Sequence, residues 1–223
     1  LPKKANEFVN TWSVDGLLSE GIQPAELGWG THEKALPADG MMIEENAGTI
    51  ILNAPGIRTK VKTWTPLSKE CEGFVITHNE AISISKYLET EGYRPTCHYA
   101  YHPCVDAISS VHDFCGRGYE RQEIARILSD EIIEGTDELG VLLMGGEKAL
   151  WFGSLLNIEG ARKIAPFNSA TSLQITSGVL SAICYAIAHP DMGLIEADDM
   201  DYEFALEISK PYLGEMVAVY TDF

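Results

Sequence analysis

The chain has 223 residues and is strongly acidic: 33 aspartates and glutamates against 16 lysines and arginines give a formal net charge of −17. This charge argues against a surface that binds nucleic-acid phosphates or anionic lipids, because both kinds of surface rely on clustered lysine and arginine. A hydrophobic fraction of 45% and a charged fraction of 22% are typical of a globular protein with a full core.

The N-terminus and the cysteines predict a cytoplasmic location without a membrane anchor. The N-terminus lacks the apolar region of a signal peptide. The most apolar segment, residues 172–188, is interrupted by polar residues and does not reach the about 18 apolar residues of a membrane span. The five cysteines are scattered and form no C-x-x-C motif, which indicates reduced thiols. Because the first residue is leucine, we expect further sequence upstream.

The first half of the chain predicts a loop followed by short strands and a helix. The first forty residues are rich in glycine and proline and are expected to be loop-like. Three β patterns follow at residues 49–52, 60–64 and 73–77, and the Asn-Ala-Pro-Gly turn between the first two predicts a hairpin. A helix is predicted to begin near Thr77, because Thr77-His78-Asn79-Glu80 matches a capping box.

The second half predicts strands first and helices later. Residues 94–102 alternate between two prolines and are expected to form a strand, and residues 106–114 a helix. Residues 126–133 and 139–144 are predicted to pair as a hairpin, and a glycine pair joins the second of them to residues 150–152. The remaining predicted elements are helices over residues 159–164, 171–188 and 199–209 and a strand over residues 216–220.

This order of elements predicts an α+β fold. We expect a mixed, mainly antiparallel sheet covered by helices, in the manner of a two-layer sandwich, with residues 1–223 as one domain.

The glycine motifs of nucleotide-binding proteins are absent. The sequence contains no G-x-G-x-x-G after a strand, no G-x-x-x-x-G-K-[ST] and no G-x-S-x-G. The chain is therefore not expected to bind a dinucleotide by itself through a Rossmann turn.

Two clusters have residue types found in metal sites. Cys97-His98-Tyr99-Ala100-Tyr101-His102-Pro103-Cys104 contains zinc-ligand types, but an extended backbone rises about 3.3 Å per residue and would place His98 and His102 roughly 13 Å apart. These histidines could equally line a cleft or lie satisfied in the core. The acidic residues 196–201 lack the pattern of an EF-hand loop and are expected to cap the helix that follows.

Aromatic and acidic residues alternate in the first forty positions. An indole face beside carboxylates suits an organic ammonium, through cation–π attraction and ion pairing. The alternative is that the tryptophans anchor a core and the acids are solvated. The residues of this pattern are Trp12, Glu20, Glu26, Trp29, His32 and Glu33.

His78 and Glu80 lie at the predicted start of a helix, where functional side chains are often presented. Glu80 could instead be only the third residue of the capping box. The pattern leaves both interpretations open.

Several long blocks resemble the bacterial homospermidine synthases, and the resemblance runs nearly from end to end. The blocks are N-T-W-S-V-D-G from Asn10, S-E-G-I-Q-P-A-E-L-G-W-G-T-H-E from Ser19, T-H-N-E-A-I-S from Thr77, R-P-T-C-H-Y-A-Y-H-P-C from Arg94, D-E-L-G-V-L-L-M-G from Asp137 and P-Y-L-G from Pro211. Proteins of this family are similar in build to saccharopine dehydrogenase. The resemblance implies that an upstream Rossmann domain holds NAD, while residues 1–223 form a substrate-binding and dimerisation domain of a homodimer that would be inactive alone.

The family's reaction condenses two putrescine molecules into homospermidine and releases ammonia, through imine and Schiff-base stages, with NAD as hydride carrier. The resemblance implies that Trp12 presents its ring face to the substrate cation and that Glu20 and Glu80 lie near the substrate nitrogens. It also implies that His78 hydrogen-bonds the substrate and helps to move protons.

Two other functions stay open at this point. A related saccharopine-type dehydrogenase, acting on an amino acid or a carboxylated diamine, would need an arginine clamp for the substrate carboxylate. The six arginines of the chain do not cluster in sequence with Trp12 and Glu20. The third reading is a diamine-binding or dimerisation module without catalytic activity.

Overall fold

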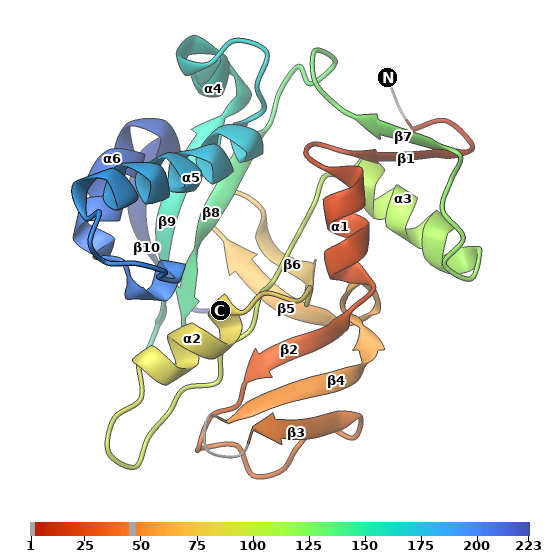
Figure 1. The fold of residues 1–223 in the computed structure, drawn as a ribbon. Coiled ribbons are helices and arrows are strands. Elements are labelled where there is room, and N and C mark those ends of the chain that lie inside the picture. The colour runs from red at the N-terminus through yellow and green to blue at the C-terminus, as the bar shows by residue number, and fades with distance from the viewer. Residues whose placement is uncertain (1–2, 45–47) are drawn as a thin grey trace. The chain divides into compact units, whose positions relative to one another are not determined.

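The computed structural model describes residues 3–44 and 48–223, and this part of the chain has an α+β fold (Figure 1). It divides into two compact units. The N-terminal unit comprises residues 3–63 and 70–126, and the C-terminal unit comprises residues 64–69 and 127–223, in each case within the described residues.

The N-terminal unit contains most of the short strands. Its elements, some of which end just beyond the unit, are β1 (Glu7–Asn10), α1 (Val14–Gly21), β2 (Pro24–Gly28), β3 (Gly40–Glu44), β4 (Thr49–Pro55), the 3₁₀-helix η1 (Gly56–Arg58), β5 (Lys60–Thr65), β6 (Lys69–Phe74), α2 (Glu80–Tyr87), α3 (Val105–Gly116) and β7 (Ile124–Ile127). β2, β4 and β3 form an antiparallel sheet, and β5 pairs with β6 and β1 with β7.

Two apolar clusters form the core of the N-terminal unit. One covers the inner face of the β2-β4-β3 sheet and contains Ala25, Leu27, Ile50, Leu52 and Val75. The other gathers β1, α1, β6 and α3 around Phe8, Val14, Leu17, Ile57, Phe74, Ile76, Val111 and Phe114. Trp12, Tyr99 and Tyr101 pack, partly buried, at the edge of this second cluster.

The prediction of a loop-like first forty residues is wrong. β1 is fully buried and pairs with β7, more than a hundred positions later, so no local pattern announces it. α1 begins at Val14 because the Ser13 hydroxyl accepts the Gly16 amide as an N-cap. This helix has only eight residues, too few for a clear apolar period.

Both hairpins predicted from turn residues in the first and middle thirds are wrong. β4 pairs with β2 and β3 instead of with β5, because Pro55 and Gly56 lead into η1. β7 pairs with β1, while β8 (Thr136–Leu143) pairs with β9 (Ala149–Asn157). Residues 94–102 are extended, but they make isolated bridges, Gly28 with Cys97 and Phe74 with Tyr101, and no full strand.

The C-terminal unit is an antiparallel sheet in the order β10-β9-β8 with helices against it (Figure 1). Its other elements are α4 (Ile158–Ile164), α5 (Ala170–Ala188), the 3₁₀-helix η2 (Ala197–Asp199), α6 (Tyr202–Leu213) and β10 (Glu215–Thr221). The glycine pair that was expected to join residues 139–144 to residues 150–152 forms the turn between β8 and β9, which pair with each other as an antiparallel hairpin that was not predicted. The three predicted helices and the last strand are confirmed.

The α5 helix is long and apolar enough to cross a membrane by length and composition, a test that core helices of soluble proteins also pass. Two of its buried polar residues bond neighbouring elements of the unit. Gln174 donates to the Ser154 hydroxyl on β9 at 3.1 Å. Ser181 bonds the Ala205 carbonyl and the Ser209 hydroxyl on α6, at 3.0 and 2.7 Å. These contacts attach one side of α5 to β9 and α6, while only 33% of its most apolar 18-residue window is buried.

The turn between β5 and β6 is fixed to β8 within the C-terminal unit. The Glu138 carboxylate accepts four hydrogen bonds from this turn. The donors are the Thr65 hydroxyl, the Leu67 amide, the Ser68 amide and the Ser68 hydroxyl, at 2.6–3.2 Å. The carboxylate therefore stands in for the backbone partners that the turn lacks.

Candidate functional site

The structure brings together three acid and base side chains from two segments that lie far apart in sequence. Glu20 lies in the last turn of α1, and His78 and Glu80 lie at the start of α2. His78 and Glu80 both act electrostatically on Glu20. The Thr77 hydroxyl donates to the Pro24 carbonyl, which fixes the start of α2 beside the chain that leaves α1. Distant segments of one unit therefore form a shared site.

Glu20 is the half-buried carboxylate of this site. Burial raises its pKa, the His78 imidazole opposes that shift, and the charge of Glu80 adds to it. Within the described part of the chain, its Oε2 atom is buried and has no hydrogen-bond partner. A buried acceptor without a donor is costly, so this oxygen is ready to receive an N–H group from a ligand.

Glu80 does not act as the third residue of a capping box, which was one of its two predicted roles. α2 begins at Glu80 itself, and Asn79, at the N-cap position, makes no side-chain capping bond. The Thr77 hydroxyl is engaged by Pro24, so the predicted capping box does not form. The exposed Glu80 carboxylate is therefore left for another role beside Glu20.

Trp12 is held by a hydrogen bond and by close packing. Its indole Nε1 donates to the Tyr101 hydroxyl at 2.7 Å, and the two rings stand at 78° with centroids 6.3 Å apart. A Cβ atom on Gly16 would lie 2.7 Å from the indole, so glycine is needed there for Trp12 to lie against α1. The ring is only partly buried, which leaves part of it open to a ligand.

His78 is flanked by a second tyrosine. The ring centroids of His78 and Tyr99 are 4.0 Å apart and their planes stand at 78°. Tyr99 and Tyr101 were not among the predicted site residues. The signal that could have found them is their alternation in an extended segment, which places both side chains on one side of the backbone.

The other residues of the N-terminal aromatic and acidic pattern have local roles. Trp29 packs on the inner core of the β2-β4-β3 sheet. Glu33 accepts the Thr96 hydroxyl at 2.7 Å, and His32 stacks on Tyr93 at 5.9 Å. Glu26 lies on β2 opposite Ile51. For Trp29 the alternative of a core anchor is the correct one.

The His/Cys cluster and the acidic run are also accounted for. His98 is half-buried, and burial lowers its pKa. The exposed His102 places Nδ1 2.8 Å from the Glu72 carbonyl oxygen. Across residues 3–44 and 48–223, no group of three or more His, Cys, Asp or Glu side chains is arranged to hold a metal ion. Asp201 caps α6, as predicted for the acidic run.

Gly28, Gly145 and Gly146 do not form a dinucleotide cradle. A Cβ atom on Gly28 would meet Ser85 and the Ala81 carbonyl at 2.3–2.5 Å, so Gly28 serves the packing of β2 against α2. Gly145 and Gly146 form the exposed β8–β9 turn. The described residues of this chain therefore do not fit NAD through a glycine-rich turn.

The arginines have hydrogen-bond or ion-pair partners other than Trp12, Glu20, His78 and Glu80, which disfavours a clamp for a substrate carboxylate. Their partners include Glu7, Asp15, Asp113 and the Trp29 carbonyl. The six arginines concerned are Arg58, Arg94, Arg117, Arg121, Arg126 and Arg162.

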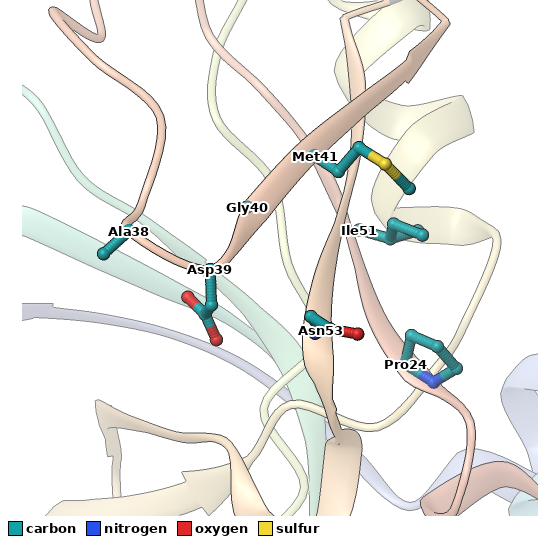
Figure 2. Close-up of a pocket in the computed structure, with 7 residues that line it drawn as sticks. All are labelled: Pro24, Ala38, Asp39, Gly40, Met41, Ile51 and Asn53. Carbon is teal, nitrogen blue, oxygen red and sulfur yellow. The ribbon is translucent and has the colours of Figure 1, made fainter.

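A separate pocket lies on the outer face of the β2-β4-β3 sheet. Its volume is about 400 Å³, and Figure 2 shows the residues that line it. It contains none of the predicted site residues. It is lined by Pro24, Ala38, Asp39, Gly40, Met41, Ile51 and Asn53.

The described residues thus form an α+β scaffold that presents an indole, an imidazole and two carboxylates. The chain belongs to the saccharopine dehydrogenase C-terminal domain family, whose sequence model matches residues 1–221.

The similar proteins of known function are homospermidine synthases, which confirms the predicted resemblance. Those of Blastochloris viridis and Mesorhizobium japonicum are 50% and 46% identical over all of this chain and 48% of their own length. The crystal structure of homospermidine synthase from Legionella pneumophila in complex with NAD matches with a TM-score of 0.93 and 46% identity, over all of this chain and 50% of that one. The chain thus spans about half the length of these relatives.

Proposed function

We propose that this chain forms the amine-binding half of a NAD-dependent homospermidine synthase, with residues 1–223 as a substrate-binding and dimerisation domain. The reaction joins two putrescine molecules to give homospermidine and one ammonia. The observation that carries the proposal is Glu20, whose partly buried carboxylate has an unpartnered oxygen beside His78 and Glu80. A substrate ammonium supplies the N–H donor and the positive charge that this carboxylate lacks.

Each of the four predicted residues has its own role in binding or deprotonating the amine. Glu20 and Glu80 bind substrate nitrogens, and Trp12 offers a ring face to an aminium or iminium ion. An amine attacks a carbon only after losing its proton, and Glu20 accepts protons more readily than an ordinary glutamate because its pKa is raised. His78 donates or accepts a hydrogen bond at the same nitrogen.

NAD belongs to the proposal as the hydride carrier, held by an upstream Rossmann domain of the same polypeptide. The described residues form no glycine-rich turn for NAD, and we assign to this chain the binding, orienting and deprotonating of the amine. The NAD in the Legionella relative supports the cofactor assignment.

The test uses the full-length protein with NAD and putrescine, followed by mass spectrometry for homospermidine and an assay for ammonia. We expect both products without net NADH, no product when NAD is omitted, and none from residues 1–223 alone. Binding of putrescine without turnover would instead identify a diamine-binding module. Preference for lysine or glutamate as substrate would identify a saccharopine-type dehydrogenase.

We further propose that the full-length protein is a homodimer built through the C-terminal unit. α5 contains no charged residue, and Ile175, Val179, Ile183 and Ile187 form an exposed row along it. On the sheet, Leu139, Val141, Leu143 and Phe152 are also about half exposed.

These eight side chains offer on the order of 700 Å², near the ~800 Å² per partner of a standard interface. Uncharged rows let two chains of net charge −17 meet without like-charge contact. Light scattering should show a dimer that dissociates on the double substitution Val179→Asp, Ile183→Asp, but not on Met192→Asp, an exposed control outside both rows. A double variant that stays dimeric would place the interface elsewhere. The cytoplasmic location also stays a prediction, consistent with five free cysteines.

A further inference from the structure

Tyr99 and Tyr101 each contact one of the four predicted site residues. Tyr101 accepts the indole N–H of Trp12, and Tyr99 stands nearly perpendicular to the His78 ring. In an extended chain, residues two positions apart point to the same side, so both tyrosines reach the site from one short segment.

The backbone of this segment is fixed at two points. Tyr101 exchanges both backbone hydrogen bonds with Phe74, at 2.7 and 2.8 Å. Cys97 does the same with Gly28, at 2.9 Å each way. A Cβ atom on Gly73 would lie 3.1 Å from Ala100, so β6 also approaches the segment closely. The backbone that carries the two tyrosines is therefore held by hydrogen bonds and does not form a free loop.

We propose that Tyr101 and Tyr99 are positioning residues, which hold the ring planes of Trp12 and His78 for the amine; this inference rests on the proposed function of that site. A cation is attracted only when it lies over the ring face, within about 6 Å of the centroid. The Tyr101 hydroxyl fixes the direction of the indole N–H and with it the face that Trp12 presents. The Tyr99 ring, 4.0 Å away, limits rotation of the imidazole.

The first test is a double-mutant cycle in the full-length enzyme. Tyr101→Phe removes the hydroxyl and keeps the ring, and we expect kcat/KM for putrescine to fall about five- to ten-fold, the usual size for one partly buried hydrogen bond. The loss should fall mainly on KM, because the indole binds the cation before any bond changes. In a Trp12→Phe background, which has no indole N–H, the same substitution should change kcat/KM less than two-fold.

Equal losses in both backgrounds would refute the role of Tyr101. So would a change in the pKa values of the pH–rate profile, because that result would make Tyr101 an acid or base instead of a positioning residue.

The second test compares two substitutions of Tyr99. Tyr99→Phe keeps a ring against His78, whereas Tyr99→Leu removes it, so the phenylalanine variant should retain several times more activity. Similar activity of the two variants would refute positioning through ring contact.

A third measurement separates this inference from the proposed function. In full-length protein labelled with 5-fluorotryptophan, the ¹⁹F resonance of Trp12 is identified by its absence in Trp12→Phe. Tyr101→Phe should shift or broaden that resonance and leave those of Trp64 and Trp151 in place. If the Trp12 resonance changes in a protein that makes no homospermidine, the proposed reaction is refuted and the positioning role of Tyr101 stands. If the resonance does not move, the positioning role is refuted, whatever product the protein makes.

Discussion

Replacing Glu20 with glutamine should make the protein more stable and less active at the same time. The substitution keeps the shape of the side chain but removes a charge that is half-buried with one oxygen unpartnered. Leaving a buried polar group unsatisfied costs about 1–3 kcal/mol, and we take about 1 kcal/mol because solvent reaches part of this side chain. For a protein with the 223 residues of this chain, 1 kcal/mol corresponds to about 2–4 °C in the melting temperature.

The stability gained from Glu20→Gln should depend on pH. Burial raises the pKa of Glu20 in the folded protein, so folding is favoured when Glu20 is protonated and is penalised once pH rises through the raised pKa. The gain from Glu20→Gln should therefore be present at pH 7–8 and should vanish below about pH 4, where the carboxyl is protonated in the folded and unfolded states.

Differential scanning fluorimetry of the full-length protein, with and without putrescine, provides the assay. At one hundred times its Kd, putrescine should stabilise the wild type by about 2.7 kcal/mol. It should have little effect on Glu20→Gln. The control is Glu207→Gln, an exposed glutamate on α6 that should change neither quantity. A Glu20→Gln protein that melts lower than the wild type at pH 8, or that still gains stability from putrescine, would contradict this reasoning.

Three further outcomes are expected. Trp12→Ala should reduce turnover more than Trp12→Phe, because a phenyl face keeps part of the cation–π attraction; equal losses in a steady-state assay would count against that role. Ser181→Val should destabilise the C-terminal unit by about 1–3 kcal/mol, because it removes the hydroxyl that bonds Ser209 and crowds the α5–α6 contact; urea denaturation with an unchanged midpoint would show that this network is dispensable. Treatment with EDTA should leave homospermidine formation unchanged, and a loss that zinc restores would reveal a metal that the His/Cys residues do not explain.

The sequence predicted those parts of the fold that local patterns determine. α5 has its apolar pattern within one stretch of chain, and the glycine pair that joins β8 to β9 lies between them in the sequence. β1 was missed because its four buried residues acquire a partner only when β7 returns from position 124. The failed hairpins have the same cause: turn residues indicate that the chain bends, but not which strand it meets next.

The candidate site was predicted as residue types and not as geometry. Trp12, Glu20, His78 and Glu80 stand in blocks that resemble a known family, and the fold places the last three within electrostatic reach. The structure adds Tyr99 and Tyr101. It also overturns the capping box, because the Thr77 hydroxyl bonds a carbonyl that lies fifty-three positions away in the sequence. No propensity of the helix start could reveal that competition.

The four hydrogen bonds to Glu138 have a consequence for how the gene can be divided. The chain leaves the N-terminal unit after residue 63, returns after residue 69 and leaves again after residue 126. Neither unit is therefore one continuous stretch of sequence, and a fragment beginning at residue 127 would lack all four donors to the Glu138 carboxylate. Recombination or truncation at a single point cannot separate the two units cleanly, so they are expected to have been inherited, exchanged and lost together.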